Sequence, residues 1–169
     1  MNIAVQIEPA SGLPPAVEYR WDPDTEILIA TLDERTASDG LSGTVELQGN
    51  DGSWLNLDVT GGSIQSIEVA VWPELRRLAA LQPPAEPDHV RVTVPARRSD
   101  NGGIASVEVN TPLAAESDPS IRTVHFRVGS PRKARTVRIG RDLLLDVDPS
   151  GRLCGLWLLN VPPLPDADL

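Results

Sequence analysis

The chain has 169 residues, 40% of them hydrophobic, and a formal net charge of −9 at pH 7. This length fits one domain or two small units with a shared core, and the apolar content excludes a wholly disordered chain. The acidic balance argues against nucleic acid as a partner, and the absence of any apolar run near ~20 residues argues against a membrane span.

Short runs of alternating apolar and polar residues predict β-strands in the first part of the chain. Residues 3–7 alternate and follow no basic region, which indicates a strand and not a signal peptide. Further strands are predicted at residues 17–21, 45–47, 55–59 and 64–69, and turn-forming residues bound each of them.

One segment departs from this alternation. Residues 73–82 begin with a proline and an acid, repeat leucine at helical spacing and stop at Pro83-Pro84. This pattern predicts a short amphipathic helix that covers a sheet edge or an open end of the core. A stiff, polar connector is expected over residues 83–88.

The second part of the chain returns to short strands. They are predicted at residues 90–94, 107–109, 124–128, 137–139, 143–147 and 153–158, and a proline-rich tail follows at 161–169. The single cysteine, Cys154, lies in an apolar strand, so the chain can form no internal disulfide. A small buried hydrophobe in a reducing compartment is the expected role, and we expect a cytoplasmic protein.

Residues 55–69 and 143–158 align with each other, with one extra turn residue in the second copy. In both copies the last strand starts out of phase, which predicts a bulge. The predicted fold is therefore mainly β, with two related antiparallel β-meanders that form a sandwich or barrel-like core and one short helix. We expect one compact pseudo-symmetric unit made of a first meander with the helix (1–82), a connector (83–88), a second meander (89–160) and a proline-rich tail (161–169).

The chain resembles a small bacterial domain-of-unknown-function family whose pattern runs roughly YDPExDxLYI and then VDxDxxGxxxGIEI. Residues 19–29 resemble its opening segment, and residues 57–69 and 143–156 resemble its closing segment. The resemblance covers residues 16–71 and 122–160, although the second copy has lost the Asp-Pro turn of the opening segment. The family implies no established activity, so the resemblance bears on the fold only.

The two copies differ on the second face of the central hairpin. The first copy has polar residues such as Asn56 and Glu68 there, whereas the second has apolar ones. An apolar second face must be covered by the other half, by the tail or by another chain. The candidate interface residues are Leu144, Trp157, Leu159 and Trp54.

Charge is distributed unevenly along the chain. Residues 1–75 hold 13 acidic and 2 basic side chains, whereas residues 122–169 hold 8 basic and 5 acidic ones. Five of the basic residues lie within 132–141, where Arg135 and Arg138 are possible anion contacts. This asymmetry favours docking of one half on the other, self-association, or capture of a basic protein partner.

The sequence contains no complete catalytic or metal-binding motif. Residues 146–151 begin like a calcium loop, but the twelfth position holds Trp157 where a bidentate glutamate is needed. The acids at 22–26 lie in a turn, and neither His89 nor His125 has a neighbour at metal-ligand spacing, so both histidines are expected at the surface. We expect no catalytic residue, no cofactor and no metal.

The sequence favours a non-enzymatic protein-interaction module that binds itself or a basic partner, and an inhibitor or immunity-type role fits the acidic half. The alternative is a small-ligand or enzymatic site in the cleft between the repeats, with Arg135, Arg138 and His125. An enzyme needs polar groups that converge in a pocket, whereas an interaction module needs an apolar patch, expected around Trp157 and Leu159.

Overall fold

The computed structural model describes residues 3–33, 40–96 and 105–164, and these residues form strands and turns with no helix. The mainly β prediction is confirmed. Within the same residues, no helix is long and apolar enough to cross a membrane. The strands are β1 (Gln6–Pro9), β2 (Val17–Asp22), β3 (Ile27–Leu32), β4 (Gly43–Gln48), β5 (Trp54–Thr60), β6 (Ser63–Val71), β7 (Leu75–Arg77), β8 (Asp88–Thr93), β9 (Ala105–Asn110), β10 (Leu113–Asp118), β11 (Thr123–Val128), β12 (Arg135–Gly140), β13 (Leu143–Val147) and β14 (Leu153–Leu158).

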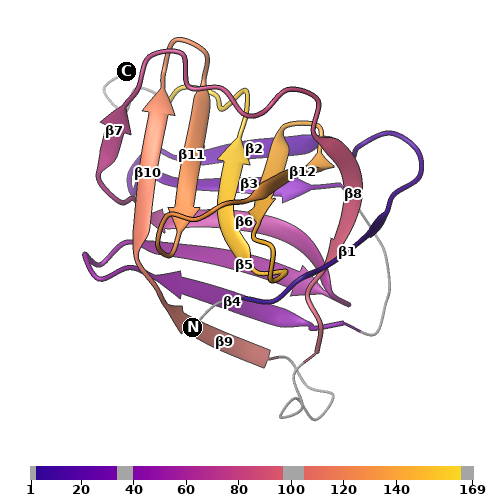
Figure 1. The fold of residues 1–169 in the computed structure, drawn as a ribbon. Coiled ribbons are helices and arrows are strands. Elements are labelled where there is room, and N and C mark those ends of the chain that lie inside the picture. Colours follow the sequence, from indigo (N-terminus) through magenta and orange to yellow (C-terminus); the bar gives the residue numbers. More distant parts are fainter. Residues whose placement is uncertain (1–2, 34–39, 97–104, 165–169) are drawn as a thin grey trace.

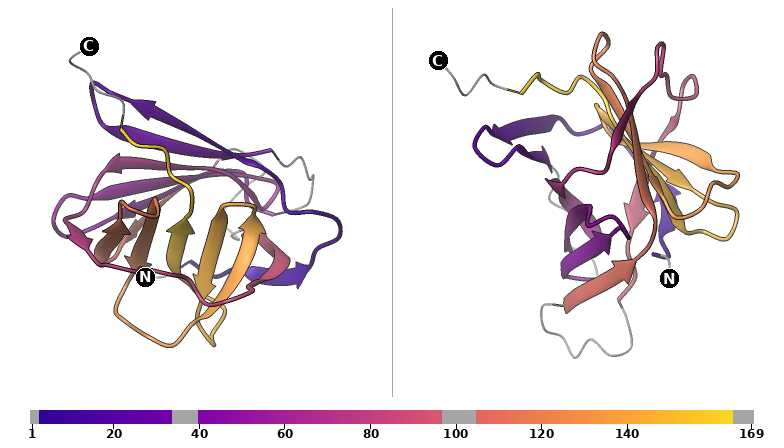
Figure 2. Two further views of the ribbon diagram at one scale, coloured as in Figure 1. Left: turned by 90° about the horizontal axis from the view of Figure 1, so that it is seen from above. Right: turned by 90° about the vertical axis from the view of Figure 1, so that its left-hand side faces the viewer.

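The strands form two sheets that are continuous with each other (Figure 1). The first sheet has the order β2-β3-β6-β5-β4-β9, and the second has the order β7-β10-β11-β14-β13-β12-β8. Neighbours are antiparallel except in the pairs β4–β9, β7–β10 and β8–β12. β8 joins the sheets because it also pairs with β6 and with β1. The result is a curled half-barrel whose sheets diverge where the C-terminal segment lies (Figure 2).

The two halves have the same strand order. It is β2-β3-β6-β5-β4 in the first half and β10-β11-β14-β13-β12 in the second. The central hairpins also have a register shift at the aligned position, between Asp58 and Val59 in one and between Asp146 and Val147 in the other. The out-of-phase sequence pattern predicts such bulges. An internal duplication accounts for both features, and common origin stays a prediction.

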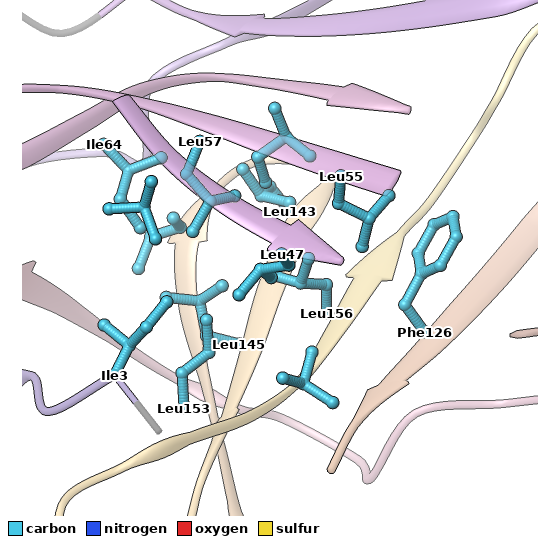
Figure 3. Packing of buried hydrophobic residues seen from close by; sticks show 14 of the residues in the cluster. Ile3, Leu47, Leu55, Leu57, Ile64, Phe126, Leu143, Leu145, Leu153 and Leu156 are labelled. Atoms are coloured by element: carbon cyan, nitrogen blue, oxygen red, sulfur yellow. The ribbon is translucent and has the colours of Figure 1, made fainter. Parts of the chain in front are cut away.

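The core lies between the two sheets, because alternate side chains of each strand point toward the opposite sheet. Figure 3 shows Leu47, Leu55 and Leu57 of the first sheet opposite Leu145 and Leu156 of the second, and all five are fully buried. Burying one such side chain contributes about 2 kcal/mol, so this layer supplies the main driving force for the two sheets to pack.

The helix predicted for residues 73–82 is wrong. Leu75–Arg77 forms β7, which pairs in parallel with β10, and the Leu78 N–H donates to the Ser117 carbonyl at 3.0 Å. The leucine spacing does not define one helix face, because Leu75 and Leu78 are exposed and Leu81 is buried. Helices shorter than ~12–15 residues are marginal on their own, so pairing with the edge of β10 prevails.

Leu81 covers the apolar second face that was predicted for the second hairpin. Leu144 and Trp157 are 0% and 6% exposed and pack with Leu81 in a small cluster, and Leu159 lies at its margin. The segment that carries Leu81 leaves β7 and passes along the end of the second sheet toward β8 (Figure 1). The chain therefore covers this face itself.

Replacing Leu81 with alanine should lower the free energy of unfolding by about 2 kcal/mol, because the substitution uncovers Leu144 and Trp157. Urea denaturation followed by tryptophan fluorescence measures this change. Leu78→Ala is the matched control, since Leu78 belongs to the same segment but is 47% exposed; we expect a change below ~0.5 kcal/mol there. Equal effects of the two substitutions would contradict the packing of Leu81.

Candidate functional site

A groove of about 790 Å³ lies where the two sheets diverge, between the end of β2 and β7. Its lining is mainly apolar and comes from the β2–β3 hairpin, Trp72, β7, the β10–β11 turn and residues 161–164. Two leucines of the lining, Leu75 and Leu164, are 42% and 41% exposed. This volume is that of a ligand or peptide site (~300–1,000 Å³).

Stacked aromatic rings form one wall of the groove. Trp21 and Trp72 stack with their centroids 5.7 Å apart, and Trp72 also contacts Phe126 of the core at 5.6 Å. The Trp72 indole N–H donates to the Glu26 carbonyl at 2.8 Å, which fixes this ring against the β2–β3 turn. The rings therefore present a rigid apolar surface at the open side of the core.

The C-terminal segment, residues 159–164, lies next to Trp21, and its residues 161–164 line the groove. Side chains of β2 hold it by its main chain: the Tyr19 hydroxyl donates to the Leu159 carbonyl at 2.7 Å, and the Trp21 indole N–H donates to the Pro162 carbonyl at 2.8 Å. Burial and the nearby Asp142 raise the pKa of Tyr19, so this hydroxyl stays a donor. Residues 165–169 of the predicted tail lie outside the described residues.

Two arginines, Arg77 and Arg122, and two acids, Glu26 and Asp118, line the groove. Arg77 and Arg122 are exposed, and neither side chain makes an ion pair or a hydrogen bond with the described residues. Asp118 also lines the groove, but its carboxylate accepts hydrogen bonds from the Ser120 hydroxyl at 2.6 Å and the Ala80 N–H at 2.7 Å. The Ser120 hydrogen bond is the main cause of the lowered pKa of Asp118.

A second polar constellation lies on the outer face of the second sheet. Asp146 accepts hydrogen bonds from His125 Nε2 at 2.8 Å, from the Thr136 hydroxyl at 2.6 Å and from the Trp157 indole at 3.1 Å. His125 stacks on Trp157 with the ring centroids 4.0 Å apart. We call these four residues the Asp146 cluster. Gly155 leaves room for it, because a Cβ there would lie 2.3 Å from Asp146 Oδ2.

The Asp146 cluster has the geometry of a structural network. Its order is hydroxyl, carboxylate, imidazole, whereas acyl transfer needs the imidazole between the hydroxyl and the carboxylate. Burial raises the pKa of Asp146, but the hydrogen bonds from His125 and Thr136 outweigh it, so the pKa lies below its ordinary value. The ionised carboxylate therefore ties four neighbouring strands together.

The first half has a simpler version of this network. Asp58, at the position aligned with Asp146, accepts from Thr44 at 3.2 Å and from Ser66 at 3.0 Å, and it is exposed. The threonine occupies the equivalent cross-strand position in both halves. The second half replaces the serine with Gly155 and encloses the carboxylate with aromatic rings.

The structure does not bring Arg135, Arg138 and His125 to one site. Arg135 forms an exposed ion pair with Asp88 at 3.3 Å. Arg138 donates to the carbonyls of Gly140 and Arg141. His125 belongs to the Asp146 cluster, and its side chain is 17% exposed, so it reaches the surface only in part. The three side chains thus make separate local contacts.

The turn that resembles a calcium loop uses its carboxylate internally. Asp148 accepts the N–H groups of Ser150 and Arg152 at 2.9 and 3.0 Å and pairs with Arg132 at 2.7 Å. Within the part of the chain that the structure describes, no three potential metal ligands meet. The Asp148 contacts stabilise the hairpin turn.

The outer face of the first sheet is acidic. Glu46 and Glu108 are cross-strand partners on β4 and β9, and Glu68 lies two strands further along the same row. Trp54 is half-buried at the end of this face, and its indole N–H has no hydrogen-bond partner among the described residues. Adjacent like charges repel each other, so this face favours a cationic neighbour.

The sequence predicts Trp21 only as part of the strand at residues 17–21, with no role at a groove. Trp21 packs against the core, but its indole N–H points to the C-terminal segment. The available signal was the contrast between four tryptophans and an otherwise low aromatic content of 4%. Trp21 and Trp72 meet at the groove because distant strands pair, whereas Trp157 stacks on His125 in the Asp146 cluster.

Asp146→Asn should lower the free energy of unfolding by about 2 kcal/mol at neutral pH, because a charged acceptor of three hydrogen bonds is lost. The folded-state pKa lies below the ordinary value of 3.8, so the contribution is present above pH 3.8 and is lost as the pH falls through the folded-state pKa. Urea denaturation of both proteins at pH 7 and below pH 3.8 measures the difference. A pH-independent difference, or one as small as that of exposed Asp58→Asn, would contradict this role.

None of the known protein-family models matches the chain, and no curated protein matches it in sequence. The candidate function therefore depends on the geometry of this chain alone.

Proposed function

We propose that the protein is a non-enzymatic interaction module that docks an extended segment of a partner protein in the groove between β2 and β7. One observation carries this proposal: at the groove, β2 already holds another segment of the chain by its main chain, through hydrogen bonds from Tyr19 and Trp21 to the carbonyls of Leu159 and Pro162. Contacts of this kind accept varied side chains, and aromatic-lined grooves are a recurring mode of peptide recognition.

Exposed apolar side chains around the groove support a docking role. Those at or next to its lining positions are 41% to 47% exposed: Val71, Leu75, Leu78, Ile121 and Leu164. Large apolar side chains that gather on one part of a surface mark contact sites for other proteins. A second copy of the chain is one such protein, and its binding would appear as a doubled solution mass in light scattering.

A second surface supports a basic partner. Glu46 and Glu108 stand side by side on the outer face of the first sheet, with Glu68 in the same row. A partner that brings lysine or arginine side chains there would relieve this repulsion, as in an inhibitor or immunity-type complex.

The competing function is a small-ligand site in the same groove. The volume of about 790 Å³ lies in the ordinary range for small molecules, and Arg77 and Arg122 could hold an anionic group. A small ligand would bind without the main-chain contacts that a peptide makes, so the two functions respond differently to a peptide library.

We also propose a cytoplasmic location. Cys154 is a buried free thiol, and burial raises its pKa to about 11, so it reacts little. An unpaired structural cysteine is typical of proteins in reducing compartments.

Selection from a random linear-peptide library displayed on phage tests the docking function. We expect enriched peptides whose affinity falls at least ~10-fold for Leu75→Ser, because Leu75 lines the groove and is 42% exposed, so the substitution spares the fold. Leu13→Ser, at a leucine that is 91% exposed and outside the groove, is the matched control and should leave affinity unchanged. Failure to enrich any peptide, or equal binding to both variants, would contradict the proposal.

A further inference from the structure

We infer that the partner segment adds as a strand to the free edge of β7 and carries carboxylate side chains that pair with Arg77 and Arg122. This inference rests on the proposed docking function and names the mode and the chemistry of recognition.

The outer side of β7 is an unused strand edge. Leu75–Arg77 pairs with β10 on one side, and β7 is the last strand of the second sheet, so no described strand adjoins its other side. All three residues of β7 are exposed. Edge strands offer unpaired N–H and C=O groups, and extended peptides bind such edges by adding a strand.

Side-chain alternation places this edge beside the groove. Leu75 and Arg77 line the groove, whereas Arg76 between them does not. A strand added next to β7 would send alternate side chains toward the same groove, over Leu75 and the ring of Trp72. The partner positions over Leu75 and Trp72 therefore need apolar side chains, and the groove-facing positions next to Arg77 and Arg122 need carboxylates. The positions between these face the other side of the sheet.

The charged side chains at the groove indicate which charged groups a partner segment should carry. Arg77 and Arg122 have no ion pair within the described ranges, and Arg76 adds a third positive charge on β7. The carboxylate of Asp118 accepts hydrogen bonds from Ser120 and Ala80 and forms no ion pair with either arginine, and Glu26 lies on the β2–β3 hairpin, whereas Arg77 lies on β7. Arginine forks bind carboxylates with two parallel hydrogen bonds, so an acidic segment complements this rim.

The net charge of −9 does not prevent an acidic segment from binding at the groove. At physiological ionic strength exposed charges are screened over about 8 Å, so the charged side chains that line the groove, Arg77 and Arg122 with Glu26 and Asp118, matter more there than the net charge. The acidic face of the first sheet is a separate surface with the opposite preference.

Binding of synthetic peptides to the full chain, followed by fluorescence polarisation, tests the inference. The peptides share leucine at the groove-facing positions over Leu75 and Trp72, serine at the positions that face the other side, and Glu, Ser or Lys at the groove-facing positions next to Arg77 and Arg122. We expect the Glu peptide to bind about tenfold more tightly than the Lys peptide, and Arg77→Glu with Arg122→Glu to reverse this order. Arg152→Glu is the matched charge control, because Arg152 is exposed on the turn before β14 and does not line the groove.

N-methylation of the Glu peptide tests strand addition. Methyl groups on one set of alternate amides should weaken binding at least ~10-fold, and methyl groups on the other set should leave it nearly unchanged, because only one set faces β7. Equal effects of the two sets, or no preference between the Glu and Lys peptides, would overturn the inference. If this inference is overturned but library-selected peptides still need Leu75 for binding, the proposed docking function remains. If neither the synthetic nor the library-selected peptides bind, the inference and the docking function are both contradicted.

Discussion

Among the described strands, β8 pairs with members of both sheets, and the shape of the protein depends on this connection. β8 pairs with β12 at two positions and with β6 only where Ser63 meets Thr93. Hydrogen bonding therefore closes one side of the core, whereas β2 and β7 remain edges on the other. The stacked rings of Trp21 and Trp72 and the C-terminal segment cover the apolar core there, and the groove remains between them. The candidate site is thus a consequence of incomplete closure.

Each half has a cross-strand threonine–aspartate pair at the same position, but the two pairs lie in different surroundings. Thr44 and Asp58 lie in solvent, where a hydrogen bond between them stabilises little. Thr136 and Asp146 make the same contact beneath Trp157 and His125, where an unpaired carboxylate would be costly. The second hairpin therefore depends on a complete polar network, and its apolar cover by Leu81 follows from the need to exclude water.

Much of the fold could be predicted from the sequence, because period-two alternation reports which face of a strand is buried. The strand at 124–128 and the hairpin at 143–158 follow this rule, and the apolar residues Leu144 and Trp157 correctly indicated a covered second face. The helix at 73–82 failed because local leucine spacing competes with the edge of β10, a tertiary partner that no local pattern encodes. A cleft between the repeats is the alternative site expected from the sequence, with Arg135, Arg138 and His125, but the groove is lined by Trp21 and Trp72, which meet only across paired strands.

The parallel pairing of β9 with β4 has a consequence for the order in which the protein forms. Gly43 pairs with Ala105, so the last strand of the first sheet belongs to the part of the chain that leads into the second sheet. During synthesis, the first half emerges with the edge of β4 bare and stays incomplete until residues 105–110 leave the ribosome. The two halves therefore cannot mature one after the other. The pairing of β4 with β9 joins segments that are distant in the sequence, and such pairing slows folding.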